Sequence, residues 1–340
     1  MEGLQRVGPL RAIPDTLRQL GKNPVTIISK TGIRPDILDN PENTITFTDT
    51  GKLLQACVTA AKCPHFGLLV GQQTGIADLG AVGQLMRHAP SVGRAIQDLC
   101  INQQRYVNGS VIYLRTQGQS AIWGYGIHHP NMRAIEQAYD LVTAMGLNIM
   151  RELAGLAPDQ IRLARRAPDN VRPYLQVFGR SPVFDAEQTA LVFSSKSLKQ
   201  PVRNANSRVR ADVAKYVANY WLTTQPTTRD RVVRILRARS ISGDATLGAV
   251  ARDLRFQTRT LNRRLREENT SFRDLRNLAR LEIARQLLTG TRMRVTDIAS
   301  ALSYADPSVF TRAFKKWSGK SPEAWRKLAW RNVAAAAEEG

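Results

Sequence analysis

Two stretches near the C-terminus carry side chains that can hydrogen-bond to nucleic-acid bases and phosphates. Arginine can grip the O6 and N7 edge of guanine with two hydrogen bonds, and asparagine can do the same at adenine N6 and N7. The candidate contacts are Arg259, Asn262, Arg263, Arg266, Ser308, Thr311, Arg312, Lys315 and Lys316. Such charges also suit the solvated face of any amphipathic helix, but two sets at a fixed interval favour DNA binding.

Each set lies on the second helix of a predicted helix-turn-helix unit, and the units span about residues 246–266 and 295–317. In each unit, two short helices carry apolar side chains at helical spacing on either side of a polar turn. These apolar residues are Val250, Ala251, Leu254, Leu261, Leu265, Ile298, Ala299, Leu302, Val309, Phe310 and Phe314. Two short helices bury only a small core, so the outer face of the second is free to enter a major groove. The same spacing turns Arg264 away from that face.

A connecting helix is predicted over residues 272–288, between the two units. Ser271 and Asp274 form a capping-box-like start, and Gly290 suits the end. Its buried stripe is Leu275, Ala279, Ile283 and Leu287. A stiff helix of this length would fix the two recognition helices in grooves about one DNA turn, roughly 34 Å, apart. Phosphate contact and a solvated face both remain open for Arg273, Arg276, Arg280 and Arg285.

These residues resemble the DNA-binding domain of the AraC/XylS family of bacterial transcription regulators. The matching motifs are Arg259-Thr-Leu-x-Arg-x-Leu265, Asp297-Ile-Ala-x-x-Leu302, Asp306-Pro-Ser-x-Phe-x-Arg-x-Phe-Lys-x-Trp317 and Gly319-x-Ser-Pro-x-x-Trp-Arg326. The resemblance covers roughly 100 residues. It implies that the two recognition helices enter successive major grooves on one DNA face. By position, that role falls to Arg259, Asn262, Arg263, Ser308, Thr311 and Arg312.

Three residues depart from that family pattern. Gln257 and Arg294 stand where the family often has a helix cap, and Ser303 stands where it often has a turn glycine. Loss of a cap typically costs on the order of 1 kcal/mol. The departures therefore predict weaker local stability and leave the expected fold unchanged.

The charge of the chain is concentrated in the same region. The 340 residues carry a formal net charge of +21 and a sequence pI near 10.6. Between Arg229 and Arg331 there are 24 basic and 10 acidic residues, so +14 of that charge lies in under a third of the chain. A basic balance can also reflect a membrane surface or arginine-rich codon usage, but its clustering indicates a nucleic-acid partner.

Cysteine usage and the N-terminus indicate the compartment. The three cysteines, Cys57, Cys63 and Cys100, form no C-x-x-C pair, and an odd, sparse set suits a reducing cytosol. The first two lie on apolar helical faces and are expected to be buried. There is no signal-peptide core and no run of about 20 apolar residues. We expect a bacterial cytoplasmic protein associated with the nucleoid, with no membrane partner.

The N-terminal part mixes helical and strand periodicity, which predicts an α+β domain. Strand patterns are expected at residues 25–28, 160–164, 182–185 and 189–193, and a hairpin at residues 110–115 and 120–127. A long helix is expected at residues 132–156. Residues 65–192 also resemble the N-terminal domain of one branch of the same family, which includes arginine- and ornithine-responsive regulators. The resembling motifs include His65-Phe-Gly-Leu-Leu-Val-Gly71, Pro90-Ser-Val-Gly93 and Phe184-Asp-Ala-Glu-Gln-x-Ala190. In that branch the domain is taken to bind an effector, to dimerise, or both.

Catalysis and cofactors are not expected. The sequence has no H-E-x-x-H, G-x-S-x-G, P-loop or G-x-G-x-x-G motif. Neighbouring His128 and His129 on a strand would point to opposite faces, which disfavours a shared metal. The aromatic residues could line an apolar pocket, but core packing is favoured for each of Trp123, Tyr125, Tyr139, Tyr174 and Phe178.

The sequence as a whole predicts a two-domain transcription regulator that is not an enzyme. We expect an effector-binding and dimerisation domain at residues 1–205, a linker helix and hinge at 206–228, and an all-α DNA-binding domain at 229–331. Its partners would be double-stranded promoter DNA, a small-molecule effector, a second copy in a homodimer and RNA polymerase. The alternatives are a ligand-independent architectural DNA-binding protein and an enzyme in the N-terminal domain.

Overall fold

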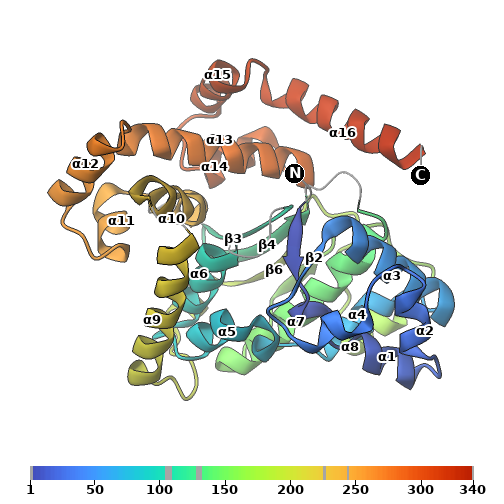
Figure 1. The fold of residues 1–340 in the computed structure, drawn as a ribbon. Helices are drawn as coiled ribbons and strands as arrows, with labels where there is room; N and C mark the ends of the chain where they lie inside the picture. The colour runs from blue at the N-terminus through green and yellow to red at the C-terminus, as the bar shows by residue number, and fades with distance from the viewer. Residues whose placement is uncertain (1–2, 104–108, 128–131, 225–226, 243–244, 339–340) are drawn as a thin grey trace.

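A four-stranded antiparallel sheet lies at the centre of the molecule, between two layers of helices (Figure 1). The computed structural model describes residues 3–103, 109–127, 132–224, 227–242 and 245–338. The strand order is β3-β4-β6-β5, with β3 at Ser110–Gln117, β4 at Ser120–Ile127, β5 at Gln160–Arg162 and β6 at Thr189–Ser194. One face packs against helices of the N-terminal part, above all α7 (Ile135–Ala154) and α6 (Val92–Gln103). The other packs against α10 (Thr228–Ser242) and α13 (Phe272–Gly290).

The middle of strand β3, from Val111 to Leu114, is apolar at every position. Ile112 and Leu114 point toward the N-terminal helices, whereas Val111 and Tyr113 belong to a core shared with the C-terminal helices. Successive side chains of a strand point to opposite faces, so a sheet covered on both sides needs a continuous apolar run. The register pairs Tyr113 with Gly124 of β4, where a Cβ atom would collide with the Tyr113 ring.

The N-terminal part holds two separate hydrophobic cores. One lies between the sheet and the helices α5 (Gly80–Arg87), α6 and α7, and includes Trp123 and Tyr174. The other is built from α1 (Ile13–Gln19), α3 (Phe47–Ala61) and α4 (Phe66–Gln72), which pack on the N-terminal half of α7. A small ladder of β1 (Leu4–Arg6) and β2 (Thr44–Thr46) ties the start of the chain to this second core.

The remaining elements of this part are short. Helix α8 (Arg172–Phe178) follows β5, and α9 (Ser207–Thr224) leads toward α10. The 3-10 segments are η1 (Gly8–Leu10), η2 (Pro35–Asp39), η3 (Ile76–Leu79) and η4 (Ser195–Lys199). The predicted hairpin, long helix and connecting helix are confirmed, and the α+β and all-α regions are arranged as the sequence indicated. The three cysteines are buried as free thiols, and burial raises the pKa of Cys57 and Cys100 to about 12.

Two predicted strands are wrong. Residues 25–28 belong to helix α2 (Pro24–Ser29), whose cap Asn23 accepts a hydrogen bond from the Thr26 amide at 3.3 Å. Asparagine at the cap and proline at the first position start a helix, and these signals outweigh the β-branched side chains that follow. Residues 182–185 form only an isolated bridge between Arg162 and Val183. The histidine pair at 128–129 lies outside the described residues.

None of the described helices is by itself long and apolar enough to cross a membrane. The pair α3 and α4 would meet the length and composition criteria together, across a bend of 106°. Both helices bury apolar side chains in the second core, among them Leu53, Leu54, Phe66 and Val70.

Candidate nucleic-acid interface

The first predicted recognition helix is α12 (Thr258–Glu267), which follows α11 (Leu247–Asp253) across a short turn. Leu261 and Leu265 are buried against Val250 of α11 and Leu236 of α10. This small core fixes the rotation of α12 about its own axis. Arg259, Arg263 and Arg266 are consequently exposed, and Asn262 is half-buried beside them.

Arg264 is directed away from this exposed face, as the sequence predicted. Its guanidinium lies 4.4 Å from the centre of the Phe256 ring, a cation–π contact. Arg263 has a weak partner of its own, since its Nε lies 3.8 Å from a carboxylate oxygen of Glu267. Both of those side chains are more than 60% exposed, so the pair is solvent-screened and easily opened.

The second recognition helix is α15 (Pro307–Ser318), which follows α14 (Val295–Ala301). Asp306 caps it by accepting a hydrogen bond from the Ser308 amide at 2.6 Å. Hydrogen bonding by the Ser308 side chain, and next by this amide, lowers the pKa of the Asp306 carboxyl. Phe310 and Phe314 are buried against Ile298 and Leu302. The exposed face then carries Ser308, Arg312, Lys315 and Lys316.

Thr311 is less available than its neighbours on α15. It is half-buried, and its hydroxyl donates to the carbonyl of Pro307 at 3.0 Å. A hydroxyl has one proton to donate, so Thr311 can offer a ligand only its oxygen lone pairs and its methyl group. Such a methyl group could contact the methyl of thymine.

Helix α13 belongs to the cores of both units. Leu275 and Ala279 pack in the first unit, and Ile283 and Leu287 pack in the second. Ser271 caps the helix as predicted, with its hydroxyl accepting from the Asp274 amide at 3.2 Å. Its 19 residues span about 28 Å at 1.5 Å per residue. Because α13 is a single helix that packs in both cores, it holds α12 and α15 at a fixed separation.

The sequence left phosphate contact and a solvated face open for the arginines of α13, and two of them, Arg280 and Arg285, have neither role. Arg280 lies 4.9 Å from the ring centre of Tyr304, and Arg285 lies 4.6 Å from that of Trp325. Both guanidinium groups are half-buried on aromatic faces, and burial lowers the pKa of Arg280. They brace α13 against the turn before α15 and against α16 (Pro322–Glu338). Arg273 remains exposed, and Arg276 is half-buried.

The loop that joins α13 to α14 rests on the central sheet. The hydroxyl of Tyr113 donates to Gln188 and lies 3.7 Å from the sulfur of Met293. The amide of Arg292 donates to the carbonyl of Glu187 at 2.7 Å. The second helix-turn-helix unit is therefore anchored to the N-terminal part through its base, and α15 lies on the side away from the sheet (Figure 1).

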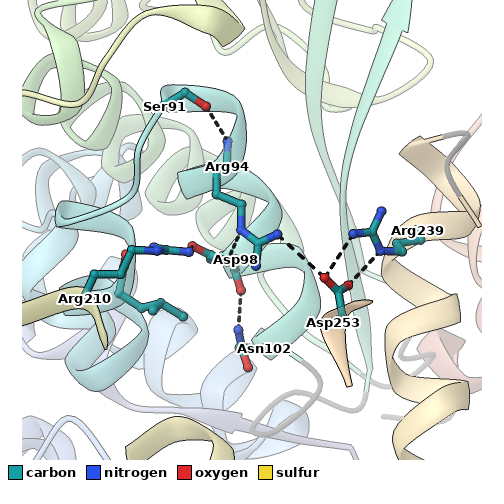
Figure 2. Close-up of polar contacts among 8 residues, drawn as sticks. Ser91, Arg94, Asp98, Asn102, Arg210, Arg239 and Asp253 are labelled. Carbon is teal, nitrogen blue, oxygen red and sulfur yellow. Dashed lines mark hydrogen bonds and ion pairs between the residues drawn. The ribbon is translucent and has the colours of Figure 1, made fainter. Parts of the chain in front are cut away.

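A charge network joins the N-terminal part to the first unit (Figure 2). Arg94 of α6 binds Asp98 one turn further along at 2.9 Å and lies 3.9 Å from Asp253 of α11. Arg239 of α10 binds the same Asp253 at 2.8 Å, and Arg210 of α9 binds Asp98 at 2.7 Å. Asp98 is 1% exposed, and burial raises its pKa despite two arginine partners. Nothing in the local sequence signalled this network, because its members are scattered along the chain.

The five aromatic residues that were considered for a pocket divide between a cavity and the two hydrophobic cores. Trp123 and Tyr125 line a cavity inside the N-terminal part. Tyr174 and Phe178 pack in its first core. Tyr139 packs in the second core, and its hydroxyl lies 3.5 Å from the carbonyl of Gly290 at the end of α13.

Comparison with known proteins places both parts of the chain. Residues 21–202 match the family described as the arabinose-binding domain of AraC transcription regulator, N-terminal, and residues 250–328 match a helix-turn-helix domain. The chain is 24% identical to the HTH-type transcriptional regulator VirS of Mycobacterium tuberculosis, over 95% of this chain and 96% of that protein. It is 27% identical to the ornithine utilization regulator of Pseudomonas aeruginosa, over 93% and 94%. The crystal structure of the transcriptional regulator CdpR from Pseudomonas aeruginosa aligns over 91% of this chain and 97% of that chain, with 23% identity and a TM-score of 0.46.

Proposed function

The chain belongs to the AraC family of transcription regulators, and on that premise we propose that it binds specific promoter DNA through α12 and α15. The proposed base and phosphate contacts are Arg259, Asn262, Arg263, Arg266, Ser308, Thr311, Arg312, Lys315 and Lys316. The observation that carries this proposal is the pair of exposed cationic faces, each backed by its own small core and both fixed to α13. Arginine and asparagine on such faces can read base edges, while lysine binds phosphate as a point charge.

We propose the same division of labour that the sequence predicted. Residues 1–205 would bind a small-molecule effector and take part in dimerisation, residues 206–228 would act as linker helix and hinge, and residues 229–331 would bind DNA. The protein would be cytoplasmic and nucleoid-associated, would have no enzymatic activity, and would act on promoters alone or together with RNA polymerase. What supports an effector role is the cavity inside the N-terminal part and the contacts that link this part to both helix-turn-helix units.

Helix α9 is the proposed dimer contact. Val209 and Tyr216, two turns apart, are 39% and 59% exposed, and the half-buried Val213 lies between them. The side of α9 next to this stripe packs on the N-terminal part, with Val217 buried and Arg210 donating to the carbonyl of Leu85 at 2.6 Å. An exposed apolar stripe on a helix that is held in place along its flank suits pairing with a second copy.

In vitro selection of DNA from a random duplex library by the purified full chain tests the proposed function. We expect an enriched motif with two blocks centred about one helical turn, roughly 10 base pairs, apart. The control carries Arg263→Ala and Arg312→Ala together and should lose the motif while retaining a salt-dependent affinity. Equal affinity for all sequences, with only a salt slope, would instead identify an architectural DNA-binding protein.

A further inference from the structure

The two hydrophobic cores of the N-terminal part are separated by a cavity of about 140 Å³. Its wall takes Leu10, Leu54 and Leu141 from one core, and Leu99, Trp123 and Met145 from the other. Protein interiors are normally close-packed, and voids larger than a water molecule are few per domain. A cavity of this size between two cores leaves both of them incompletely packed.

Four apolar side chains on the cavity wall remain only half-buried. They are Leu79 of η3, Ile112 of β3, Tyr125 of β4 and Val142 of α7. Each of them also packs against one of the two cores. The wall therefore offers uncovered apolar surface from four separate elements, and a molecule that filled the space would contact both cores at once.

The charged groups on the wall are already neutralised by the protein. Arg6 forms an ion pair with Glu42 and donates to the carbonyls of Leu79 and Pro41, at 2.8 and 3.2 Å. The carboxylate of Asp78 accepts from the Gly75 amide at 2.9 Å and lies 3.7 Å from Arg11. A charged ligand would have to break these contacts to gain a counter-ion, and burying an unpaired charge is costly.

The uncharged polar groups on the wall are engaged in the same way. Thr143 donates to the carbonyl of Tyr139 at 2.7 Å, Thr189 accepts from the Ala164 amide at 3.1 Å, and Asn102 donates to the carbonyl of Asp98 at 2.7 Å. Gln5 donates to Thr50. Because these groups already hydrogen-bond to the protein, mostly to its backbone, the wall presents mainly apolar atoms to an occupant.

From this wall we infer that the cavity binds a small, uncharged, largely apolar molecule about the size of one aromatic ring. A cavity of about 150 Å³ lined by Leu, Ile and Phe is large enough to hold benzene, which sets the scale. Trp123 and Tyr125 add aromatic faces that suit a planar ligand. Amino acids and sugars fit this wall poorly, because most of their polar groups would be buried against apolar atoms.

The binding of a ligand in this cavity is argued from the structure alone. Only the statement that this ligand is the effector rests on the proposed function. The cavity wall includes Leu99 and Asn102 of α6, the helix whose Arg94 faces Asp253 of the first helix-turn-helix unit. Occupancy of the cavity is thus positioned to act on α6 and through it on α11.

Two probe molecules of similar size test whether the cavity discriminates against charge. Calorimetry and ligand-detected NMR on the full chain would compare benzyl alcohol with benzoate, which has a similar ring but carries a charge. We expect saturable binding of benzyl alcohol and a melting temperature that rises with its concentration. Equal or stronger binding of benzoate, or no binding of benzyl alcohol, would overturn the inference.

A cavity-filling variant locates the site. Val142→Phe should weaken benzyl alcohol binding by at least about tenfold, since adding or removing even one methylene in an apolar pocket changes affinity 10–200-fold. Ile112→Phe fills the cavity from the opposite wall and serves if the first variant does not fold. The matched control is Val25→Phe on the exposed surface of α2, which should leave binding unchanged. Unchanged binding in a folded cavity-filling variant would place the ligand elsewhere and refute the assignment.

DNA binding by the same variants distinguishes the two proposals. A wild type that binds DNA specifically but binds no benzyl alcohol would refute the cavity site and leave the proposed function intact. Loss of benzyl alcohol binding in Val142→Phe, together with unchanged sequence-specific DNA binding, would support the cavity site. Failure of the wild type to select DNA, with ligand binding intact, would refute the proposed function alone.

Discussion

The guanidinium of Arg94 lies 3.9 Å from the carboxylate of Asp253 and so joins α6 to α11 (Figure 2). Each partner is also held from its own side, Arg94 by Asp98 and Asp253 by Arg239. The pair is therefore pre-oriented from the N-terminal part and from the first helix-turn-helix unit, and loses little side-chain entropy on forming. It joins α6, a helix that contributes Leu99 and Asn102 to the cavity wall, to the first helix-turn-helix unit.

Removal of Arg94 should loosen α11 without unfolding the protein. A double-mutant cycle with Arg94→Ala and Asp253→Ala should give a coupling energy of about 0.2–1 kcal/mol, because both side chains are partly exposed. Hydrogen exchange of the α11 amides should become faster in Arg94→Ala. Arg87→Ala is the control, since Arg87 pairs with Glu152 inside the N-terminal part. An unchanged exchange rate in α11 would mean that the contact carries no mechanical coupling.

Arg263 should discriminate between bases rather than merely attract DNA. Arg263→Ala should cost about 1–3 kcal/mol at one base position if the side chain reads guanine. Lys316→Ala should weaken all sequences alike and lower the slope of affinity against salt by about one unit. Binding measured across a set of single-base operator variants distinguishes these patterns. A uniform loss with Arg263→Ala would assign Arg263 to phosphate.

The turn of the second unit is strained at Ser303, which adopts a φ of +58°. A non-glycine residue in this left-handed region costs roughly 1–2 kcal/mol. Ser303→Gly should therefore stabilise the protein by about 1 kcal/mol in denaturant unfolding. Ser300→Gly on the exposed side of α14 is the matched control and should destabilise it by about 0.5–1 kcal/mol. A destabilising Ser303→Gly would show that strain is absent from this turn.

Asp140 should make stability fall as the pH rises. Burial raises its pKa to about 6, an effect that Arg165 and Tyr174 only partly offset. Between the ordinary pKa of about 3.9 and this raised value, the unfolded chain releases its proton before the folded protein does. Ionisation thus costs the folded state stability from about pH 4 to pH 6, and the cost is constant above that.

Melting temperatures of the wild type and Asp140→Asn, compared from pH 4 to 7, check this dependence. Asparagine cannot ionise, so the difference between the two proteins should shift in favour of the variant up to about pH 6 and then level off. Loss of the partner of Arg165 adds an offset that does not vary with pH, since arginine stays charged. A difference that is flat over this range would contradict the raised pKa.

The apolar stripe on α9 should decide oligomerisation. Tyr216→Asp places a charge at the most exposed residue of the stripe and should shift the protein from dimer to monomer in sedimentation equilibrium. Lys215→Asp is the control, because Lys215 lies beside the stripe and pairs with Asp212. A wild type that is monomeric at micromolar concentration would rule out α9 as a stable dimer contact.

The sequence alone determined the elements whose signals are local. The Ser271 cap, the stripe from Leu275 to Leu287 and the aromatic spacing of Phe310 and Phe314 each predict a helix and its buried face, and the structure confirms them. The β3–β4 hairpin followed from its central turn in the same way. At residues 25–28, by contrast, strand propensity misled, because the stronger local signal was the Asn23–Pro24 helix start.

Only the tertiary structure decided which distant residues meet. The cavity between two cores, the partners of Arg280 and Arg285, and the contact from Arg94 to Asp253 each join segments far apart in the chain. Periodicity reports which side of a helix is buried, because neighbouring residues share one axis. It carries no information on what lies across from that side, since this depends on how whole elements pack. The exposed faces of α12 and α15 could therefore be predicted from local spacing, whereas the connection of these helices to the interior of the N-terminal part required the fold.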